Sequence, residues 1–330
     1  MTGWPSALAG FLLAGTVAGT PLFAFQDPAI TESSGLVDAG RTVYTVNDSG
    51  SQPVLYAVDA GTGRTRATTT YTSADVTDVE ALAPAPGGDV WVGDIGDNLR
   101  SRDAIAVYRV TPGQPDATRI ELTYPDGPRD AETLLAHPRT GRLFVVSKTV
   151  FGATVYAAPR RLEPVVPNPM RAVAVVPGLV TDGTFLPDGR HVLLRGYGAA
   201  TLLSFPDFAV LGSFDLPEQE QGEGLAVGED VRILLSSEGR SAEVLLLELP
   251  DRLQMIVDAL PSTEATPQSA TPSPSASADW TGSKRADEPT RQASDVQTRR
   301  VGGWVLLGSI GALVVTGVVS AARSRRRPGE

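Results

Sequence analysis

The chain has 330 residues and a net charge of −10, and it contains no cysteine and only two histidines. This composition excludes disulfides, zinc–thiolate centres and histidine-rich metal sites, and it disfavours a Ser-His-Asp triad. Residues 26–250 carry 30 acidic against 18 basic residues, so we expect no nucleic-acid partner, because nucleic-acid phosphates require a basic surface.

Residues 1–25 contain an apolar segment rich in small residues, SALAGFLLAGTVAGTPLFAF. This composition is typical of the hydrophobic region of a secretory signal peptide, and Thr16-Val17-Ala18 provides a small-residue cleavage context. No basic residue precedes the segment. It is therefore predicted to be either a signal peptide or an N-terminal anchor.

Between residues 26 and 260, short β-rich runs alternate with Gly, Pro, Asp and Asn. One pattern recurs five times: an acidic residue, a weak strand, a turn, a stronger strand and a closing polar cluster. The acidic residues are Glu32, Glu80, Glu132, Asp182 and Glu223, separated by 48, 52, 50 and 41 residues. Each interval has room for four strands, so the repeat predicts an all-β fold, a β-propeller of about five four-stranded blades.

The fifth unit lacks a clear fourth strand, and residues 21–30 could supply it and close the ring. If RLQMIVDAL (252–260) or the N-terminal segment formed further strands, a sixth blade would be possible. A β-sandwich of similar length is the alternative all-β fold.

In a propeller, the acidic starts and the closing polar clusters share one face around the central channel. Converging carboxylates repel one another unless a cation, a proton or an arginine compensates their charge. Oxygen ligands without cysteine favour Ca²⁺, and Mg²⁺ fits less well because it keeps several waters. The alternative is that these acids accept hydrogen bonds at strand ends or pair with arginine. The predicted metal ligands are Glu32, Glu80, Asp94, Asp97, Asn98, Glu132 and Glu223.

Basic residues lie beside the same loops, and the candidates are Arg129, Lys148 and Arg195. They could bind a phosphate or carboxylate ligand, or they could be salt-bridge partners of the acidic residues. His137 and His191 fall in turns at the opposite end of the repeat. We expect both histidines at the surface and outside any acid–base chemistry.

Residues 261–300 are dominated by Ser, Thr, Pro and Ala, which predicts a disordered stalk. Residues 301–322 contain no charge and are long enough to cross a bilayer as one helix. Residues 323–330 carry more arginines than the segment just before the span, which predicts a basic cytoplasmic tail. We therefore expect a monomer anchored in the cell membrane by a single C-terminal span, with its propeller domain (26–260) extracellular.

Five segments of the repeat, DPAITESSGL, VNDSG, VGDIGDN, DAETLLAHPRTG and QGEGLA, resemble an exported bacterial β-propeller family. Its relatives carry names such as "esterase-like phytase" and WD40-like propeller. The resemblance covers about residues 26–250 and implies the propeller fold. By analogy with beta-propeller phytases, it implies Ca²⁺ ligands at Asp94, Asp97, Asn98, Glu132 and Glu223, and phosphate contacts at Lys148 and Arg195.

Three functions are compatible with this sequence. The favoured one is a ligand-binding, sensing or interaction module with a Ca²⁺ site, whose partner is a small anionic ligand or a cell-surface protein. The second is a Ca²⁺-dependent phosphoesterase, in which the metal lowers the pKa of a bound water. The third is a purely structural propeller without metal.

Overall fold

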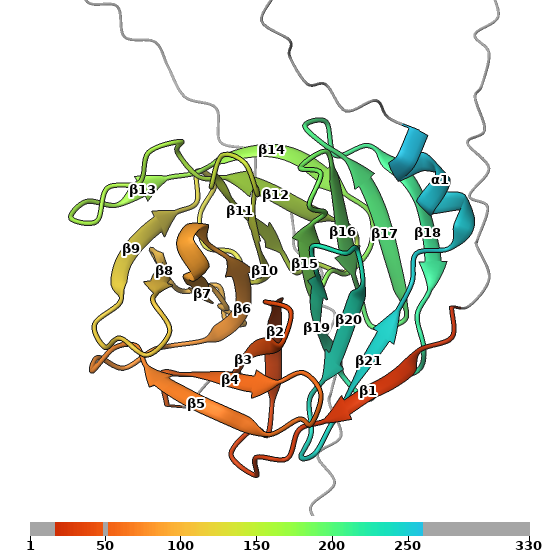
Figure 1. Ribbon diagram of the computed structural model, residues 1–330. Coiled ribbons are helices and arrows are strands. Elements are labelled where there is room, and N and C mark those ends of the chain that lie inside the picture. Colours follow the sequence, from red (N-terminus) through yellow and green to blue (C-terminus); the bar gives the residue numbers. More distant parts are fainter. Residues whose placement is uncertain (1–16, 49–51, 260–330) are drawn as a thin grey trace, which may run out of the picture. The chain divides into compact units, whose positions relative to one another are not determined.

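The computed structural model describes residues 17–48 and 52–259, whose strands form five sheets around a common axis (Figure 1). The innermost strands are β2 (Ser33–Asp38), β6 (Val79–Pro84), β10 (Ala131–Ala136), β15 (Asp182–Phe185) and β19 (Gly222–Val227). Each inner strand contacts the inner strand of the next blade, and β19 contacts β2, so the ring is closed. The prediction of a five-bladed propeller is confirmed, and the β-sandwich alternative is wrong.

The other strands follow outward in order within each blade. The second strands are β3 (Thr42–Asn47), β7 (Val90–Asp94), β11 (Leu143–Ser147), β16 (His191–Arg195) and β20 (Ile233–Ser237). The third strands are β4 (Val54–Asp59), β8 (Ile105–Val110), β12 (Ala153–Ala157), β17 (Ala199–Ser204) and β21 (Glu243–Leu247). The outer strands are β5 (Thr65–Thr70), β9 (Thr118–Thr123), β14 (Arg171–Val176), β18 (Val210–Asp215) and β1 (Thr20–Ala24). A short strand β13 (Asn168–Pro169) pairs parallel to β9, and the turn η1 (Pro86–Gly88) joins β6 to β7.

The N-terminal strand β1 closes the ring by completing the fifth blade. It pairs antiparallel with β21, from Thr20 opposite Leu246 to Ala24 opposite Glu243. The predicted closing segment was 21–30, which overlaps β1. Because β1 begins at Thr20, the propeller starts several residues before the expected boundary at residue 26. A strand supplied by one terminus to a blade built from the other protects an otherwise open sheet edge.

The segment considered for a sixth blade is a helix. Helix α1 (Asp251–Ala259) follows β21 and buries Leu253 and Val257. These two side chains pack into the apolar cluster between the fourth and fifth blades. The six-bladed alternative is therefore wrong for the described residues.

The core is divided into five apolar clusters, one between each pair of neighbouring blades. Inner strands are covered on both faces, and all six residues of β10 are buried. The outer strand β14 of the same blade is largely exposed. Burial therefore decreases from the axis to the rim within this blade.

Among residues 17–48 and 52–259, no helix is long and apolar enough to cross a membrane. The predicted stalk (261–300), transmembrane helix (301–322) and cytoplasmic tail (323–330) lie outside the described residues. Most of the predicted signal peptide or anchor, residues 1–16, also lies outside them.

Candidate functional site

Three glutamates occupy the same place in their blades, at the start of the inner strand. In the second blade, Val79 pairs with Asp94 but Ala81 pairs with Gly93, so Glu80 is an extra residue in a β-bulge. Glu132 and Glu223 are the extra residues of equivalent bulges in β10 and β19. A bulge redirects a side chain from the regular alternation of a strand. The three glutamates are buried, with 4 to 5% of their surface exposed.

The first and fourth blades differ at this position. In β2, Ser33 pairs with the last residue of β3, as Val79 pairs with the last residue of β7, so Ser34 takes the place of Glu80, although the register shift itself falls at Gly35. The hydroxyl of Ser34 donates a 2.8 Å hydrogen bond to the Glu80 carbonyl oxygen. Glu32 lies two residues earlier and is exposed, so the sequence repeat placed it out of register with the other glutamates. In the fourth blade Asp182 is fully buried and accepts hydrogen bonds from the backbone N–H groups of Gly183 and Leu225.

Further carboxylates join the glutamates from the loops of neighbouring blades. Asp48 follows β3, Asp78 precedes Val79, and Glu238 follows β20. Asp48, Asp78 and Glu80 each place a carboxylate oxygen within 4.8 Å of the others, and so do Asp48, Glu223 and Glu238. These two groups share Asp48 and could hold a metal ion. We call the set of Asp48, Asp78, Glu80, Glu132, Glu223 and Glu238 the acidic mouth.

Asp48 and Glu238 were not among the predicted metal ligands, although the sequence carried a signal for both. In three blades, the first residue after the second strand donates its backbone N–H to a carbonyl oxygen just before the inner strand. The pairs are Asp48 with Glu32, Lys148 with Asp130, and Glu238 with Gln221. Asp48 and Glu238 occupy this hairpin position, as does Lys148. Comparing the closing clusters at that single position would have identified them.

Gly96 gives the carboxylates of the second blade their room. A Cβ atom at this position would lie 2.4 Å from Asp78 Oδ2 and 2.7 Å from Glu80 Oε1. Both distances are far shorter than real Cβ contacts. The second glycine of the GDIGDN loop is therefore required by the close approach of these two side chains.

Burial and mutual repulsion favour the protonated forms of the glutamates. Burial, with added repulsion from Asp48 and Glu132, raises the pKa of Glu80 to about 11. The pKa of Glu223 rises to about 8, first through burial and then through Glu132 and Glu238. Burial raises the pKa of Glu132 to about 7 despite its ion pair with Lys148. Without a metal, the acidic mouth thus binds protons near neutral pH, and a cation can replace them.

Lys148 lies at the edge of the acidic mouth and compensates part of its charge. Its ammonium pairs with Glu132 Oε1, and this pairing outweighs burial and raises the pKa of Lys148. The same ammonium is 5.8 Å from the ring centre of Tyr197, whose hydroxyl donates a 3.4 Å hydrogen bond to Glu223. Within residues 17–48 and 52–259, the buried Glu132 Oε2 has no hydrogen-bond partner.

The other acidic residues predicted as ligands organise the loop after β7 instead. Asp94 accepts hydrogen bonds from the N–H groups of Thr77 and Asp78 and forms a 2.9 Å ion pair with Arg102. Asp97 accepts hydrogen bonds from the N–H groups of Ser101 and Arg102. Asn98 is exposed. The contacts of Asp94 and Asp97 are thus those of the alternative prediction, in which the acidic residues accept hydrogen bonds at strand ends or pair with arginine.

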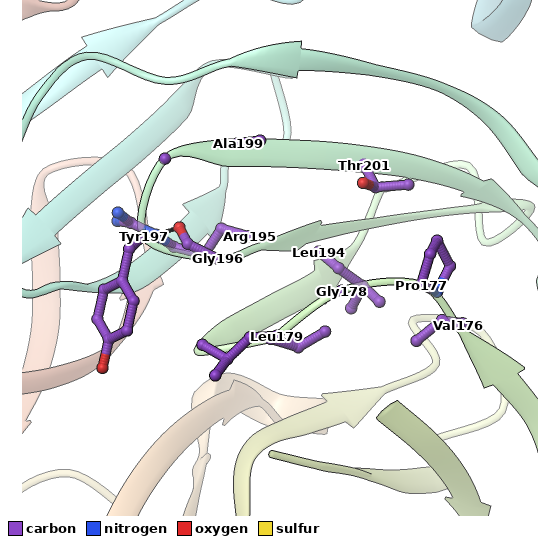
Figure 2. A pocket seen from close by; sticks show the side chains of 12 residues that line it. Val176, Pro177, Gly178, Leu179, Leu194, Arg195, Gly196, Tyr197, Ala199 and Thr201 are labelled. Carbon is purple, nitrogen blue, oxygen red and sulfur yellow. Dashed lines mark hydrogen bonds between the residues drawn. The ribbon is translucent and has the colours of Figure 1, made fainter. Parts of the chain in front are cut away.

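Two of the three basic residues predicted to bind a ligand have other partners. Arg195 is 1% exposed and donates hydrogen bonds to the carbonyl oxygens of Gly224 and Ser236. Arg129 pairs with Asp126 and donates a hydrogen bond to the hydroxyl of Tyr156. Figure 2 shows Arg195 beside Tyr197 at the β16–β17 hairpin, which borders a cavity of about 290 Å³. Of the three basic candidates, Lys148 contacts the acidic mouth through Glu132.

The fold and these contacts define a five-bladed β-propeller with a partly buried acidic cluster at one end of its axis. No family model matches the chain, and no curated protein matches it. A solved structure of a gluconolactonase from Xanthomonas campestris is similar, with 17% sequence identity and a TM-score of 0.44, over 66% of this chain and 72% of that chain. This likeness is too weak to carry an argument about function.

Proposed function

We propose that the protein is a Ca²⁺-binding propeller that uses its acidic mouth as a ligand-binding, sensing or interaction site. The observation that supports this proposal best is the position of Asp48 between two groups of carboxylates. Six acidic side chains from the first, second, third and fifth blades converge there, with Lys148 as a basic partner within the cluster. Such a concentration of negative charge is costly unless protons or cations neutralise it.

Calcium fits the donor set better than other common cations. All the candidate ligands are oxygen atoms, and Ca²⁺ accepts six to eight of them in irregular geometry. Mg²⁺ requires near-octahedral geometry and retains water, which suits a buried cluster less well. The unpartnered oxygen of Glu132 adds an acceptor at the edge of the same cluster.

The phosphoesterase alternative has little support from the basic residues. A phosphoryl group needs cationic contacts near the metal, and the guanidinium of Arg195 is enclosed by backbone carbonyl groups of the fifth blade. Lys148 remains as a possible anion contact, but its ammonium is already paired with Glu132. We therefore place a binding or interaction role ahead of hydrolysis.

Calcium titration of the full chain tests this proposal. After treatment with a chelator, saturating Ca²⁺ should raise the melting temperature, because a ligand at about 100 times its Kd stabilises the native state by about 2.7 kcal/mol. The Glu223→Gln variant should bind Ca²⁺ at least about tenfold more weakly by calorimetry, since one charged ligand is lost. Glu248→Gln, which changes an exposed carboxylate after β21, is the matched control. An unchanged melting temperature at saturating Ca²⁺ would contradict the proposal.

We further propose that residues 301–322 anchor the propeller to the outer face of the cell membrane through the stalk 261–300. The support is the uncharged length of this segment and the arginines that follow it. Protease added to intact cells should release the propeller by cutting within 261–300. A propeller that stays protected in intact cells, but is released once the cells are permeabilised, would contradict this orientation.

A further inference from the structure

A second cavity lies at the other end of the propeller axis, where the inner strands end. Its volume is about 270 Å³, and all five blades contribute to its wall. Leu36 comes from β2 and Pro84 from β6, while Pro138 lies in the turn after β10. The fourth blade contributes Pro187, and the fifth contributes Val227 and Glu229. The cavity is thus separated from the acidic mouth by the length of the inner strands.

The wall of this axial cavity is mainly apolar. Three blades present a proline there, Pro84, Pro138 and Pro187, and proline has no backbone N–H to donate. The side chains of Leu36, Val227 and their neighbours add hydrocarbon surface. An apolar ligand body would therefore bind by displacing water from this wall.

The rim of the cavity carries unbalanced negative charge. Asp38 is neutralised, because Arg232 donates hydrogen bonds of 2.6 and 2.7 Å to its two carboxylate oxygens. Glu229 is exposed, and no hydrogen bond or ion pair within residues 17–48 and 52–259 involves it. An adjoining cleft of about 480 Å³ shares Asp38 and Glu229 with the axial cavity. This cleft adds Asp230 and Arg232, and Asp230 Oδ1 lies 3.9 Å from Arg232 Nε, so Glu229 is the carboxylate at the shared rim that Arg232 does not pair with. With Arg232 engaged by Asp38, the shared rim favours a cationic group.

We propose that the axial cavity binds a small organic amine whose apolar body enters the cavity and whose ammonium pairs with Glu229. The volume limits the ligand to one ring or a short branched chain, because a cavity of about 150 Å³ accepts benzene, whereas pockets for drug-sized ligands have about 300 Å³ or more. This site is independent of the Ca²⁺ site proposed above.

Benzylamine is a suitable probe, with benzoate and benzyl alcohol as matched compounds of opposite and zero charge. Calorimetry on the full chain near neutral pH should give a Kd of about 1 mM for benzylamine, a typical strength for a fragment. Benzoate should bind at least about tenfold more weakly, because its carboxylate would face Glu229. Absence of benzylamine binding, or equal binding of benzoate, would overturn the proposal.

Variants locate the binding site. Glu229→Gln, at an exposed position, should weaken benzylamine roughly five- to tenfold and leave benzyl alcohol unchanged, as expected for one partly exposed ion pair. Val227→Trp should fill the cavity and remove the binding of both compounds. Glu248→Gln and Glu80→Gln, which alter a control surface and the acidic mouth, should bind benzylamine like the unaltered chain. Full affinity in Glu229→Gln, or loss of affinity in Glu80→Gln, would overturn the assignment.

Discussion

Raising the pH from about 5 to about 9 in the presence of a chelator should lower the melting temperature of the chain, and Ca²⁺ should restore it at the alkaline end. Glu132 and Glu223 have raised pKa values of about 7 and about 8 in the folded protein. Between about pH 4.3, where an unfolded glutamate titrates, and these values, the native state binds protons that the unfolded state has released. This contribution is complete below the unfolded pKa and is lost as the pH rises through the folded values.

The size of the effect follows from the same linkage. Each such carboxyl group lowers the unfolding free energy by at most about 1.4 kcal/mol per pH unit within its window. A change of about 1 kcal/mol moves the melting temperature of a domain of this size by about 2 to 4 °C. Scanning calorimetry at several pH values, with and without Ca²⁺, measures both dependences. The Ca²⁺-induced shift should grow with pH, because protons and Ca²⁺ compete for the same oxygens.

Glu80→Gln separates proton binding from metal binding. The amide resembles the protonated carboxyl that burial favours at this position. The variant should therefore melt at a higher temperature than the unaltered chain at about pH 8 with chelator present, and it should lose most of its response to Ca²⁺. A metal-free variant less stable than the unaltered chain at this pH would show that the Glu80 carboxylate is charged and compensated in the native protein. Glu248→Gln should leave both melting profiles unchanged.

The sequence predicted the fold well because a propeller repeats its local pattern. Strand, turn and acidic start recur in each blade, so even the closing strand could be placed: the predicted segment 21–30 overlaps the observed β1 at residues 21–24. Strand β1 lies before the expected boundary at residue 26, because the apolar residues in LFAF suit a signal peptide and an edge strand equally. RLQMIVDAL was ambiguous for the same reason, since a short apolar run does not distinguish strand from helix.

The acidic site was predicted only in part, because its geometry depends on bulges and on contacts between blades. Glu80, Glu132 and Glu223 were identified from the repeat, whereas Glu32 was two residues out of register with them. Asp94 and Asp97 have the right chemistry, but nearby N–H groups and Arg102 engage them. Composition shows which oxygen atoms exist, and only the folded chain shows which of them are already hydrogen-bonded.

The histidines show the same limit. Both were expected at the surface because they lie in polar turns. Instead His137 packs 5.0 Å from the ring centres of Phe185 and Phe205, and His191 is fully buried with its Nδ1 2.5 Å from Asp188. A turn at the end of an inner strand is covered by its neighbouring blade, which a one-dimensional pattern does not reveal.

Replacing Arg195 with methionine should destabilise the propeller more than any exposed substitution. Its guanidinium spans the junction of the fourth and fifth blades, donating hydrogen bonds of 3.0 and 3.1 Å to the carbonyl oxygens of Gly224 and Ser236. It also lies close enough to Asp182 and Glu223 for their charges to oppose the lowering of its pKa by burial. Removal would leave buried acceptors unsatisfied and acidic groups uncompensated, at a cost of about 3–5 kcal/mol.

Gly222 provides the space that makes this junction possible, since a Cβ atom there would lie 2.0 Å from Arg195 Nη2. Thermal unfolding of Arg195→Met should therefore show a melting temperature lower by roughly 10 °C, at about 2 to 4 °C per kcal/mol. Arg161→Met is the matched control, because its side chain is 90% exposed and its ion pair with Glu163 contributes little. If Arg195→Met melted like Arg161→Met but bound anions more weakly, Arg195 would be a ligand contact, as the phytase resemblance implied. The enclosed guanidinium, hydrogen-bonded to the carbonyl oxygens of Gly224 and Ser236, instead links the fourth blade to the fifth.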